Sequence, residues 1–223
     1  MTLADQILSF YKTLKIPAGL PKGVEVMNPF QNPDVFDLCK KFYHQFYNDA
    51  QPRKIIMGIN PGRHGSGTTG IPFTDPVKLE NICGIPNSLT KRTELSADFI
   101  YTMIESYGGS QLFYSKFLFS SVSPLGFTKA GINMNYYDDK SLEEKLKGFI
   151  VSSIQAQLNF SVDREVCFCM GEGKNYKYLS TLNAEYSFFK KIIPLAHPRF
   201  IMQYRRKKLH EFVSMYIQEL KTN

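Results

Sequence analysis

The run RKIIMGINPGRHGSGTTGIPF, residues 53–73, combines a buried strand with a tightly turned loop that follows it directly. Residues 53–60 are nearly all apolar after two basic side chains, as is typical of a strand buried on both faces of a sheet. Five glycines and two prolines lie within residues 58–73. Such a loop keeps its backbone close to whatever binds there, and its N–H groups can hold an anion or a carbonyl oxygen. The run therefore predicts a strand that ends at a binding loop.

Three further apolar runs have the length of buried strands, and helical patterns separate the runs along the chain. The four predicted strands cover residues 53–60, 117–125, 165–171 and 190–197. Strands that alternate with helices need crossover connections, which makes the sheet mostly parallel with helices on both faces. We therefore expect an α/β fold of three layers (α/β/α) around a central four-stranded, mostly parallel sheet. Because no repeat and no Pro-, Gly- or Ser-rich linker occurs, residues 1–223 are expected to form a single domain.

Four amphipathic patterns predict the main helices. One begins after Asp34 as its N-cap, a second spans residues 94–107, and a third begins after Ser141, which forms a capping-box pattern with Glu144. The fourth is the last helix of the chain. Its apolar stripe consists of Leu209, Phe212, Val213, Tyr216, Ile217 and Leu220.

The unusual residues gather in the segments that follow the four strands. These segments are residues 60–73, 121–131, 171–175 and 197–202. In an open α/β sheet, ligands bind beyond the carboxyl ends of the strands. The four segments are therefore predicted to converge on one site.

Motifs of a known family occur in these segments. Gly-Ile-Asn-Pro-Gly at residues 58–62, with Gly-Ile-Pro-Phe at residues 70–73, resembles the first motif of the single-strand-selective monofunctional uracil-DNA glycosylases, a family of the uracil-DNA glycosylase superfamily. His197-Pro198 resembles the start of the second motif, and Pro124-Leu125 a landmark after the second strand. The resemblance implies a parallel four-stranded sheet flanked by helices, in agreement with the strand count. It also implies a monofunctional glycosylase of base excision repair, which flips a damaged base, uracil above all, out of DNA and hydrolyses its N-glycosidic bond.

The resemblance assigns the two catalytic roles to Asn60 and His197. Hydrolysis of this bond builds positive charge on the sugar and negative charge on the departing base. It therefore needs an aligned water and a donor near the base oxygen that becomes anionic. Asn60 matches the asparagine that positions the water, and because an amide is a weak base, bond breaking should run ahead of water attack. His197 matches the histidine that stabilises the leaving anion.

Further matches imply contacts with the base. Phe73 takes the place of the aromatic residue that stacks on the flipped base in the family. Gly62 matches a glycine that leaves room beside the 5-position, so 5-substituted uracils should fit. The backbone N–H groups around Ile59 and Gly62 are candidates for holding base carbonyls.

One departure from the family concerns the edge of the base. Before the Pro-Leu landmark the family usually has Asn-x-Cys, whereas this chain has Ser121 and Ser123. A serine hydroxyl cannot reproduce the bidentate contact of the amide that reads uracil. Ser121 and Ser123 are the base-binding candidates here, and a deaminated purine, xanthine or hypoxanthine, becomes an alternative main substrate.

Basic residues near the C-terminus predict contacts with DNA. The net charge is +7, and residues 186–223 hold eight Lys/Arg but only two Asp/Glu, a distribution typical of polyanion-binding proteins. After His197-Pro198 the sequence leaves the family's Ser-Pro-Arg, so the wedge that fills the gap of a flipped base is not assigned by position. The candidate DNA-binding residues are Arg63, His64, Arg199, Phe200, Ile201, Met202, Arg205 and Arg206.

Cysteine spacing and hydropathy further limit the class of protein and the kinds of site that we expect. The four cysteines contain no Cys-x-x-Cys pair, so we expect buried thiols, no metal site and no cofactor. No run is apolar enough to span a membrane, and the N-terminus lacks the layout of a signal peptide. We expect a monomer in the cytoplasm, with the DNA (the nucleoid in a prokaryote), and DNA as its partner. No lysine lies inside the two motifs, so a Schiff-base lyase step is not expected.

Two other interpretations stay open. An α/β hydrolase or nucleotide-binding protein would need a Gly-x-Ser-x-Gly elbow, a complete P-loop or a dinucleotide fingerprint, and none is present. A non-catalytic relative that recognises damaged DNA would need the same loops as a glycosylase. Only a measurement of activity distinguishes that second interpretation.

Overall fold

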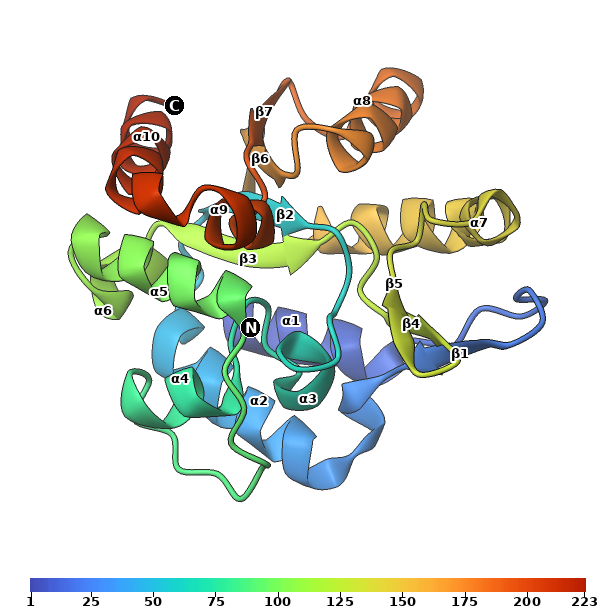
Figure 1. The fold of residues 1–223 in the computed structure, drawn as a ribbon, viewed down its shortest axis with the longest axis horizontal. Coiled ribbons are helices and arrows are strands. Elements are labelled where there is room, and N and C mark those ends of the chain that lie inside the picture. Colours follow the sequence, from blue (N-terminus) through green and yellow to red (C-terminus); the bar gives the residue numbers. More distant parts are fainter.

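The computed structural model describes residues 1–223, and its main sheet has four parallel strands (Figure 1). These are β2 (Arg53–Gly58), β3 (Phe117–Ser121), β6 (Val162–Met170) and β7 (Lys191–Leu195), in the order β3-β2-β6-β7. The predicted α/β class and four-stranded sheet are confirmed. Each strand ends one to four residues earlier than predicted, because the chain turns there into the loops of the carboxyl edge.

Successive side chains of the central strands enter two different cores. On β2, Ile56 belongs to the larger cluster of buried side chains, whereas Ile55 and Met57 belong to a smaller one on the other face. On β6, Phe168 joins the larger cluster and Cys167 the smaller. Both faces of these strands are covered, which explains why they appear in the sequence as continuous apolar runs. All four cysteines are free and buried, as predicted.

Helices cover both faces of the sheet (Figure 1). The larger cluster takes side chains from α1, α2, α5, α9 and α10, and the smaller takes them from α7 and α8. No helix has the length and apolar character needed to cross a membrane. The helix bounds are α1 (Leu3–Thr13), α2 (Pro33–Tyr47), α3 (Ser66–Thr69), α4 (Pro76–Asn81), α5 (Leu95–Tyr107), α6 (Ser110–Tyr114), α7 (Lys140–Gln157), α8 (Lys174–Tyr186), α9 (Pro198–Tyr204) and α10 (Leu209–Thr222), with short 3-10 turns at Pro29–Gln31 and Arg206–Lys208.

Two predicted helix caps are wrong by two residues. The N-cap of α2 is Asn32, whose side chain accepts from the backbone N–H of Asp34 (3.0 Å), with Pro33 as the first helical residue. The N-cap of α7 is Asp139, which accepts from Leu142 N–H (3.1 Å). In both cases an equally good cap residue lies two positions before the predicted one, and the helix begins directly after it, at Pro33 and at Lys140.

A second, antiparallel sheet was not predicted. It consists of β1 (Val24–Met27), β4 (Gly126–Lys129) and β5 (Ile132–Met134), in the order β1-β4-β5. A two-residue turn joins β4 to β5, and both of its residues have positive φ, +49° at Ala130 and +72° at Gly131. Strands of three or four residues are too short to show a period-2 pattern. The predicted strand over residues 117–125 is also too long. The strand β3 ends at Ser121, and residues 122–125 connect it to β4.

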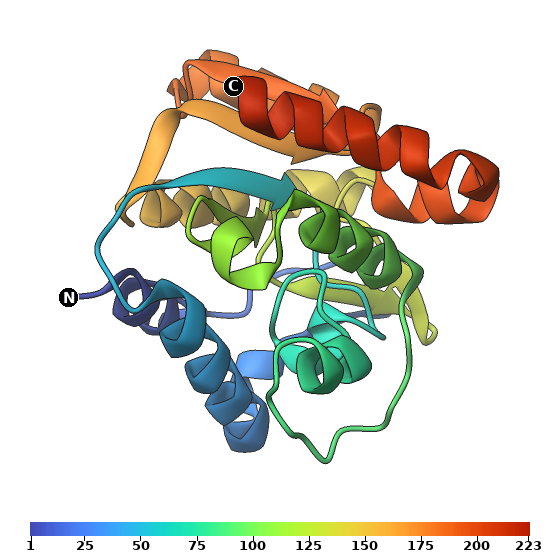
Figure 2. The same cartoon turned by 90° about the vertical axis from the view of Figure 1, so that its left-hand side faces the viewer.

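The parallel strands point their carboxyl ends at one edge of the molecule. Figure 2 shows their arrowheads directed toward the side where α9 and the loops gather. The small sheet lies beside the loop that follows β2, because the backbone N–H of Arg63 donates to Asn133 Oδ1 (3.3 Å). This edge is therefore built from the loops of one sheet and a strand of the other.

Asn175 ties three elements together at this edge. It is buried in the first turn of α8, and its Nδ2 donates to the carbonyl of Met170 at the end of β6 (2.9 Å). Its Oδ1 accepts from the hydroxyl of Tyr136, which follows β5 (2.8 Å). A buried amide with such partners fixes the distance between these elements.

Replacing Asn175 with Ala is expected to lower the free energy of unfolding by about 1–3 kcal/mol, because the Tyr136 hydroxyl and the Met170 carbonyl lose a buried partner. Urea denaturation followed by circular dichroism measures this change. Asn159→Ala is the matched control, since Asn159 is exposed. Equal stability of the two variants would contradict the role of Asn175.

Candidate active site

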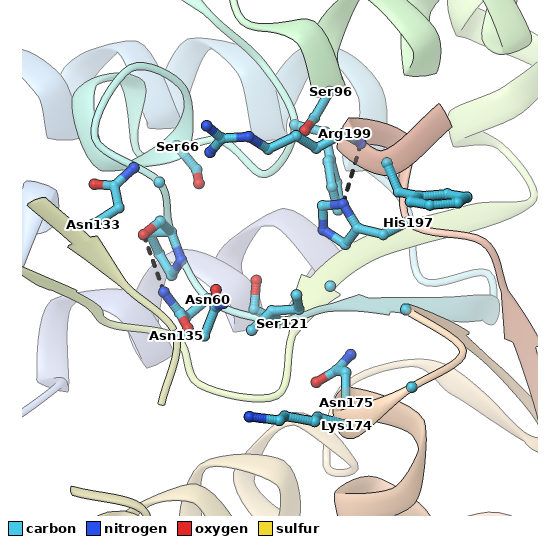
Figure 3. Close-up of a pocket in the computed structure, with 18 of the residues that line it drawn as sticks. Asn60, Ser66, Ser96, Ser121, Asn133, Asn135, Lys174, Asn175, His197 and Arg199 are labelled. Atoms are coloured by element: carbon cyan, nitrogen blue, oxygen red, sulfur yellow. Dashed lines mark hydrogen bonds between the residues drawn. The ribbon is translucent and has the colours of Figure 1, made fainter. Parts of the chain in front are cut away.

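A cavity of about 660 Å³ opens at the carboxyl edge of the parallel sheet (Figure 3). Each of the four predicted segments contributes to its lining. Residues 58–62 and Phe73 come from the end of β2 and the loop after it, and Ser121 comes from the end of β3. Residues 171–175 come from the loop after β6 and the start of α8, and His197 and Arg199 come from the segment after β7. The predicted convergence on one site is confirmed.

The amide of Asn60 is held at both ends by backbone groups. Its Nδ2 donates to the carbonyls of Met134 (3.1 Å) and Pro61 (3.3 Å), and its Oδ1 accepts from the N–H of Tyr136 (3.0 Å). Both amide protons are therefore used, whereas the amide oxygen has a second lone pair. At the cavity Asn60 can only accept one more hydrogen bond, as it would from a water molecule.

His197 faces Asn60 across the cavity, with Ser121 between them (Figure 3). Its Nδ1 accepts from the backbone N–H of Arg199 (3.1 Å) in the first turn of α9. An imidazole that accepts at Nδ1 carries its proton at Nε2. Burial, and less strongly the charge of Arg199, lower the pKa of His197 from 6.5 to about 4. The ring is therefore neutral at pH 7 and has a single N–H donor.

Phe73 forms one wall of the cavity in a strained conformation. Its φ is +54°, a region that bulky side chains rarely adopt. Its ring packs on Phe119, with centroids 5.3 Å apart, and lies against the backbone of Gly58. A β-carbon at Gly58 would be 2.8 Å from the ring atom Cζ. The glycine therefore leaves the space that this rigid ring occupies.

Four of the five predicted base-binding residues line the cavity: Ile59, Gly62, Phe73 and Ser121. The prediction for Ser123 is wrong. Its side chain is fully buried, and its hydroxyl donates to the carbonyl of Leu125 (2.9 Å), outside the cavity lining. Regular alternation would place Ser121 and Ser123 on the same face. Because β3 ends at Ser121 and the chain turns there, Ser123 points into the interior and only Ser121 can offer its hydroxyl to a ligand.

Helix α9 separates the predicted wedge candidates into two groups. Ile201 and Met202 lie in the larger hydrophobic cluster, 0% and 6% exposed, so the prediction that they contact DNA is wrong. Phe200 and Tyr204, one turn apart, are 41% and 65% exposed and line the cavity. Their ring centroids are 5.7 Å apart. Tyr204 was not predicted, although residues four apart share a helix face.

The predicted basic contacts have different positions. Arg199 lines the cavity, and Figure 3 shows its guanidinium extending from α9 toward the loop of Ser66. Arg63 and His64 lie outside the lining, and Arg63 bonds through Nη1 to the carbonyl of Gly131 in the β4–β5 turn. Burial, followed by nearby arginines, lowers the pKa of His64.

Two arginines follow α9 directly. Arg205 and Arg206 are exposed, and the guanidinium of Arg205 lies 5.4 Å from the centroid of the Phe200 ring. The aromatic and basic side chains thus form one surface beside the cavity mouth.

Several lining residues were missed by the sequence analysis. Asn133 and Asn135 belong to β5 and the residues after it, and this strand was not predicted. Lys174 falls in the predicted segment 171–175 but in no motif, and its Nζ lies 5.8 Å from the centroid of the Tyr137 ring. The sequence pattern marks Glu94 only as the start of a helix. No group of three or more His, Cys, Asp or Glu side chains is arranged to hold a metal ion.

Comparison with known proteins supports the sequence motifs. Residues 44–221 match the Uracil DNA glycosylase superfamily. Among solved structures, that of wild-type SMUG2 from Pedobacter heparinus has a TM-score of 0.97 and 46% sequence identity, covering 100% of this chain and 98% of that chain. No curated protein matches the chain. These matches confirm the resemblance that the motifs at residues 58–62 and 197–198 indicated.

The imidazole of His197 is expected to stay neutral, with its proton at Nε2, until the pH falls to about 4. Nitrogen NMR of histidine-labelled protein measures both the tautomer and the pKa. A ring proton at Nδ1, or an ordinary pKa near 6.5, would contradict this assignment.

The same pKa predicts a dependence of stability on pH. Because the folded-state pKa of His197 lies below 6.5, the unfolded chain binds the proton first as the pH falls. The contribution of His197 is therefore complete above about pH 6.5 and is lost as the pH falls toward 4. When the free energy of unfolding is measured against pH by urea denaturation, His197→Asn should lack the decrease between about pH 6.5 and 4. His210→Asn, at an exposed position, should retain it.

Proposed function

The chain belongs to the uracil DNA glycosylase superfamily and is a DNA glycosylase, and on this premise we propose that it flips a deaminated base into the cavity and hydrolyses its N-glycosidic bond without cutting the DNA strand. The observation that carries the proposal is the pair Asn60 and His197. One group that can only accept and one neutral donor face each other across the cavity. Hydrolysis of an N-glycosidic bond requires this combination.

Asn60 supports the water side of the reaction. The free lone pair of its Oδ1 accepts a hydrogen from water and orients the water oxygen toward C1′ of the sugar. An amide does not remove a proton early, so the bond to the base breaks first and the sugar gains positive charge. The role of Asn60 is thus to position the water.

His197 supports the leaving-group side. Its Nε2–H can donate to the base oxygen that gains negative charge as the bond breaks. Because the ring is neutral at pH 7, it stabilises this charge as a hydrogen-bond donor and does not need to transfer a proton. A neutral imidazole also keeps the hydrogen bond from Arg199 that orients it.

The substrate is inferred from the walls of the cavity. Phe73 supplies a ring on which a flipped base can stack, and Gly62 leaves space that ends at Glu94 and Asn133, 3.6 and 3.8 Å from a β-carbon built there. A single hydroxyl, that of Ser121, stands where the family has an amide. We therefore propose uracil and its 5-substituted forms as substrates, together with a deaminated purine.

DNA contacts are proposed for the surface beside the cavity mouth. Phe200 and Tyr204 are the exposed aromatic residues that can act as the wedge, and Arg199, Arg205 and Arg206 can contact phosphates. We expect the protein to act as a monomer where the DNA lies, in the cytoplasm.

Excess protein is expected to release uracil from a uracil-containing oligonucleotide without added metal or cofactor. His197→Ala should lower the single-turnover rate by roughly 10²–10³, the loss that follows removal of one donor to a developing anion. His210→Ala is the control at an exposed position and should keep the wild-type rate. Full activity of His197→Ala would overturn the assignment, and strand breakage before alkali treatment would overturn the monofunctional reaction.

Replacing Arg205 and Arg206 with Ala should weaken binding to every DNA sequence. The slope of log affinity against log salt should become shallower by about 1–2, since each lost phosphate contact contributes about 0.9 on duplex DNA. Lys190→Ala with Lys191→Ala is the charge-matched control, because both residues lie at the amino end of β7, away from the cavity. An unchanged slope in the arginine variant would exclude this phosphate contact.

A further inference from the structure

Two carboxyl groups line the cavity, and only that of Glu94 is partly buried, since Glu172 is exposed. Glu94 immediately precedes α5, and its backbone N–H donates to Oδ2 of Asp75 (2.9 Å). Asp75 is itself fully buried and caps α4 through the N–H groups of Val77 and Lys78. The backbone of Glu94 is therefore fixed at the inner wall of the cavity.

The side chain of Glu94 is engaged neither in a helix cap nor in an ion pair. Its position before α5 would suit a helix cap, but it forms no such hydrogen bond. It takes part in none of the seven ion pairs of the molecule. It packs instead on the loop that carries Asn60, where a β-carbon at Gly65 would lie 2.9 Å from its Cδ and one at Gly62 would lie 3.6 Å from its Oε1. The carboxyl group is thus available to a ligand.

The surroundings allow Glu94 to hold a proton near neutral pH. Burial is the main cause that raises its pKa from 4.5 to about 7. The neighbouring aspartates raise the pKa further, while the arginine on α9 and the hydroxyl of Ser96 lower it. The charged groups that act on its carboxyl are Asp75, Asp98 and Arg199. Arg63 and His64 lie on the loop between Gly62 and Gly65, the two glycines against which Glu94 packs.

We propose that Glu94 is a catalytic residue for deaminated purines, and that its carboxylic acid donates a proton to N7 of the leaving base. This inference rests on the glycosylase function proposed above and assigns the group that serves its purine substrates.

The two donors approach the base from different walls. The Glu94 carboxyl lies against the loop of Asn60, and Figure 3 shows His197 on the opposite side of the cavity. In a purine nucleotide, N3 and N7 lie on opposite sides of the glycosidic bond to N9. A base that turns its N3 side toward His197 therefore presents N7 to the wall that carries Glu94.

The step balances without any further reactant. The O–H bond of the carboxylic acid breaks and an N7–H bond forms, while the electron pair of the C1′–N9 bond passes to the purine ring. The oxygen of the water that Asn60 orients bonds to C1′. The proton lost by this water returns through solvent to the Glu94 carboxylate. The base leaves neutral, and Glu94 is protonated again.

Uracil does not use this acid. At the corresponding edge it carries C5–H and C6–H and has no nitrogen that accepts a proton. Its departure depends on the donor His197. Glu94 therefore contributes to the range of bases that the cavity processes, and its effect should differ between a purine and a pyrimidine.

The test compares single-turnover release of hypoxanthine and uracil by wild type and Glu94→Gln, which keeps the shape of the side chain but cannot transfer a proton. The hypoxanthine rate should fall by ~10² or more, the range of general acid catalysis, and the hypoxanthine-to-uracil rate ratio by at least ~10-fold. Glu105→Gln is the matched control, exposed on α5, the helix that follows Glu94, and outside the cavity. It should keep the wild-type ratio.

The pH profile of the wild type provides a test that does not depend on the folding of any variant. The acid acts only while protonated, so hypoxanthine release should slow about tenfold per pH unit above about pH 7, and uracil release should lack this decline. With 7-deazahypoxanthine, where a carbon replaces N7, wild type and Glu94→Gln should react at equal rates.

The outcomes separate the two proposals. Failure to release either base would overturn the proposed function itself. Release of uracil but not hypoxanthine would leave that function standing and overturn the role of Glu94. Equal losses for both bases in Glu94→Gln, or a loss that persists with 7-deazahypoxanthine, would also overturn it, with thermal denaturation reporting whether the variant is folded.

Discussion

A chain of hydrogen bonds through Asn60, Tyr136 and Asn175 holds the carboxyl edge of the sheet in one arrangement. The backbone N–H of Tyr136 donates to Asn60 Oδ1, and its hydroxyl donates to Asn175 Oδ1. Asn175 in turn donates to the carbonyl at the end of β6. Because buried polar groups are costly when they lose a partner, these bonds join the loop after β2, the small sheet and α8. The direction of the single free lone pair of Asn60, and with it the proposed position of the water, depends on this chain.

Burial at the cavity shifts the pKa values of His197 and Glu94 in opposite directions. Burial disfavours the charged form of any group, so it lowers the pKa of His197 and raises that of Glu94. Near pH 7 the first is a neutral donor and the second can carry a proton. A neutral hydrogen-bond donor on one wall suits a base that departs with negative charge, and an acid on another wall suits a base that accepts a proton as it departs. The proposed activity on both pyrimidines and purines follows from this pair.

The predictions for Ser123 and for Ile201 and Met202 are wrong for a common reason, the direction in which a side chain points. Ser121 and Ser123 are equally polar and only two residues apart, yet Ser123 is buried because the chain leaves β3 and bends toward the small sheet. In α9, Phe200 and Ile201 are adjacent apolar residues, and packing of the helix decides that one is exposed and the other is in the core. Residue type alone contains no information about which of two neighbours faces solvent.

The sequence by itself determined the four parallel strands, the helices between them and the convergence of their loops, because long apolar runs and glycine-rich turns are local patterns that do not need a partner to be recognised. Its motifs also predicted Asn60, His197 and Phe73 as site residues, and all three line the cavity. Only the tertiary structure decided that the small sheet forms, because its strands are too short for a periodic signal. It also decided that Glu94 lines the cavity. That residue reaches the cavity because Asp75 fixes its backbone and two glycines of a distant loop leave it space. Such contacts between remote segments are set by packing, and no local pattern encodes them.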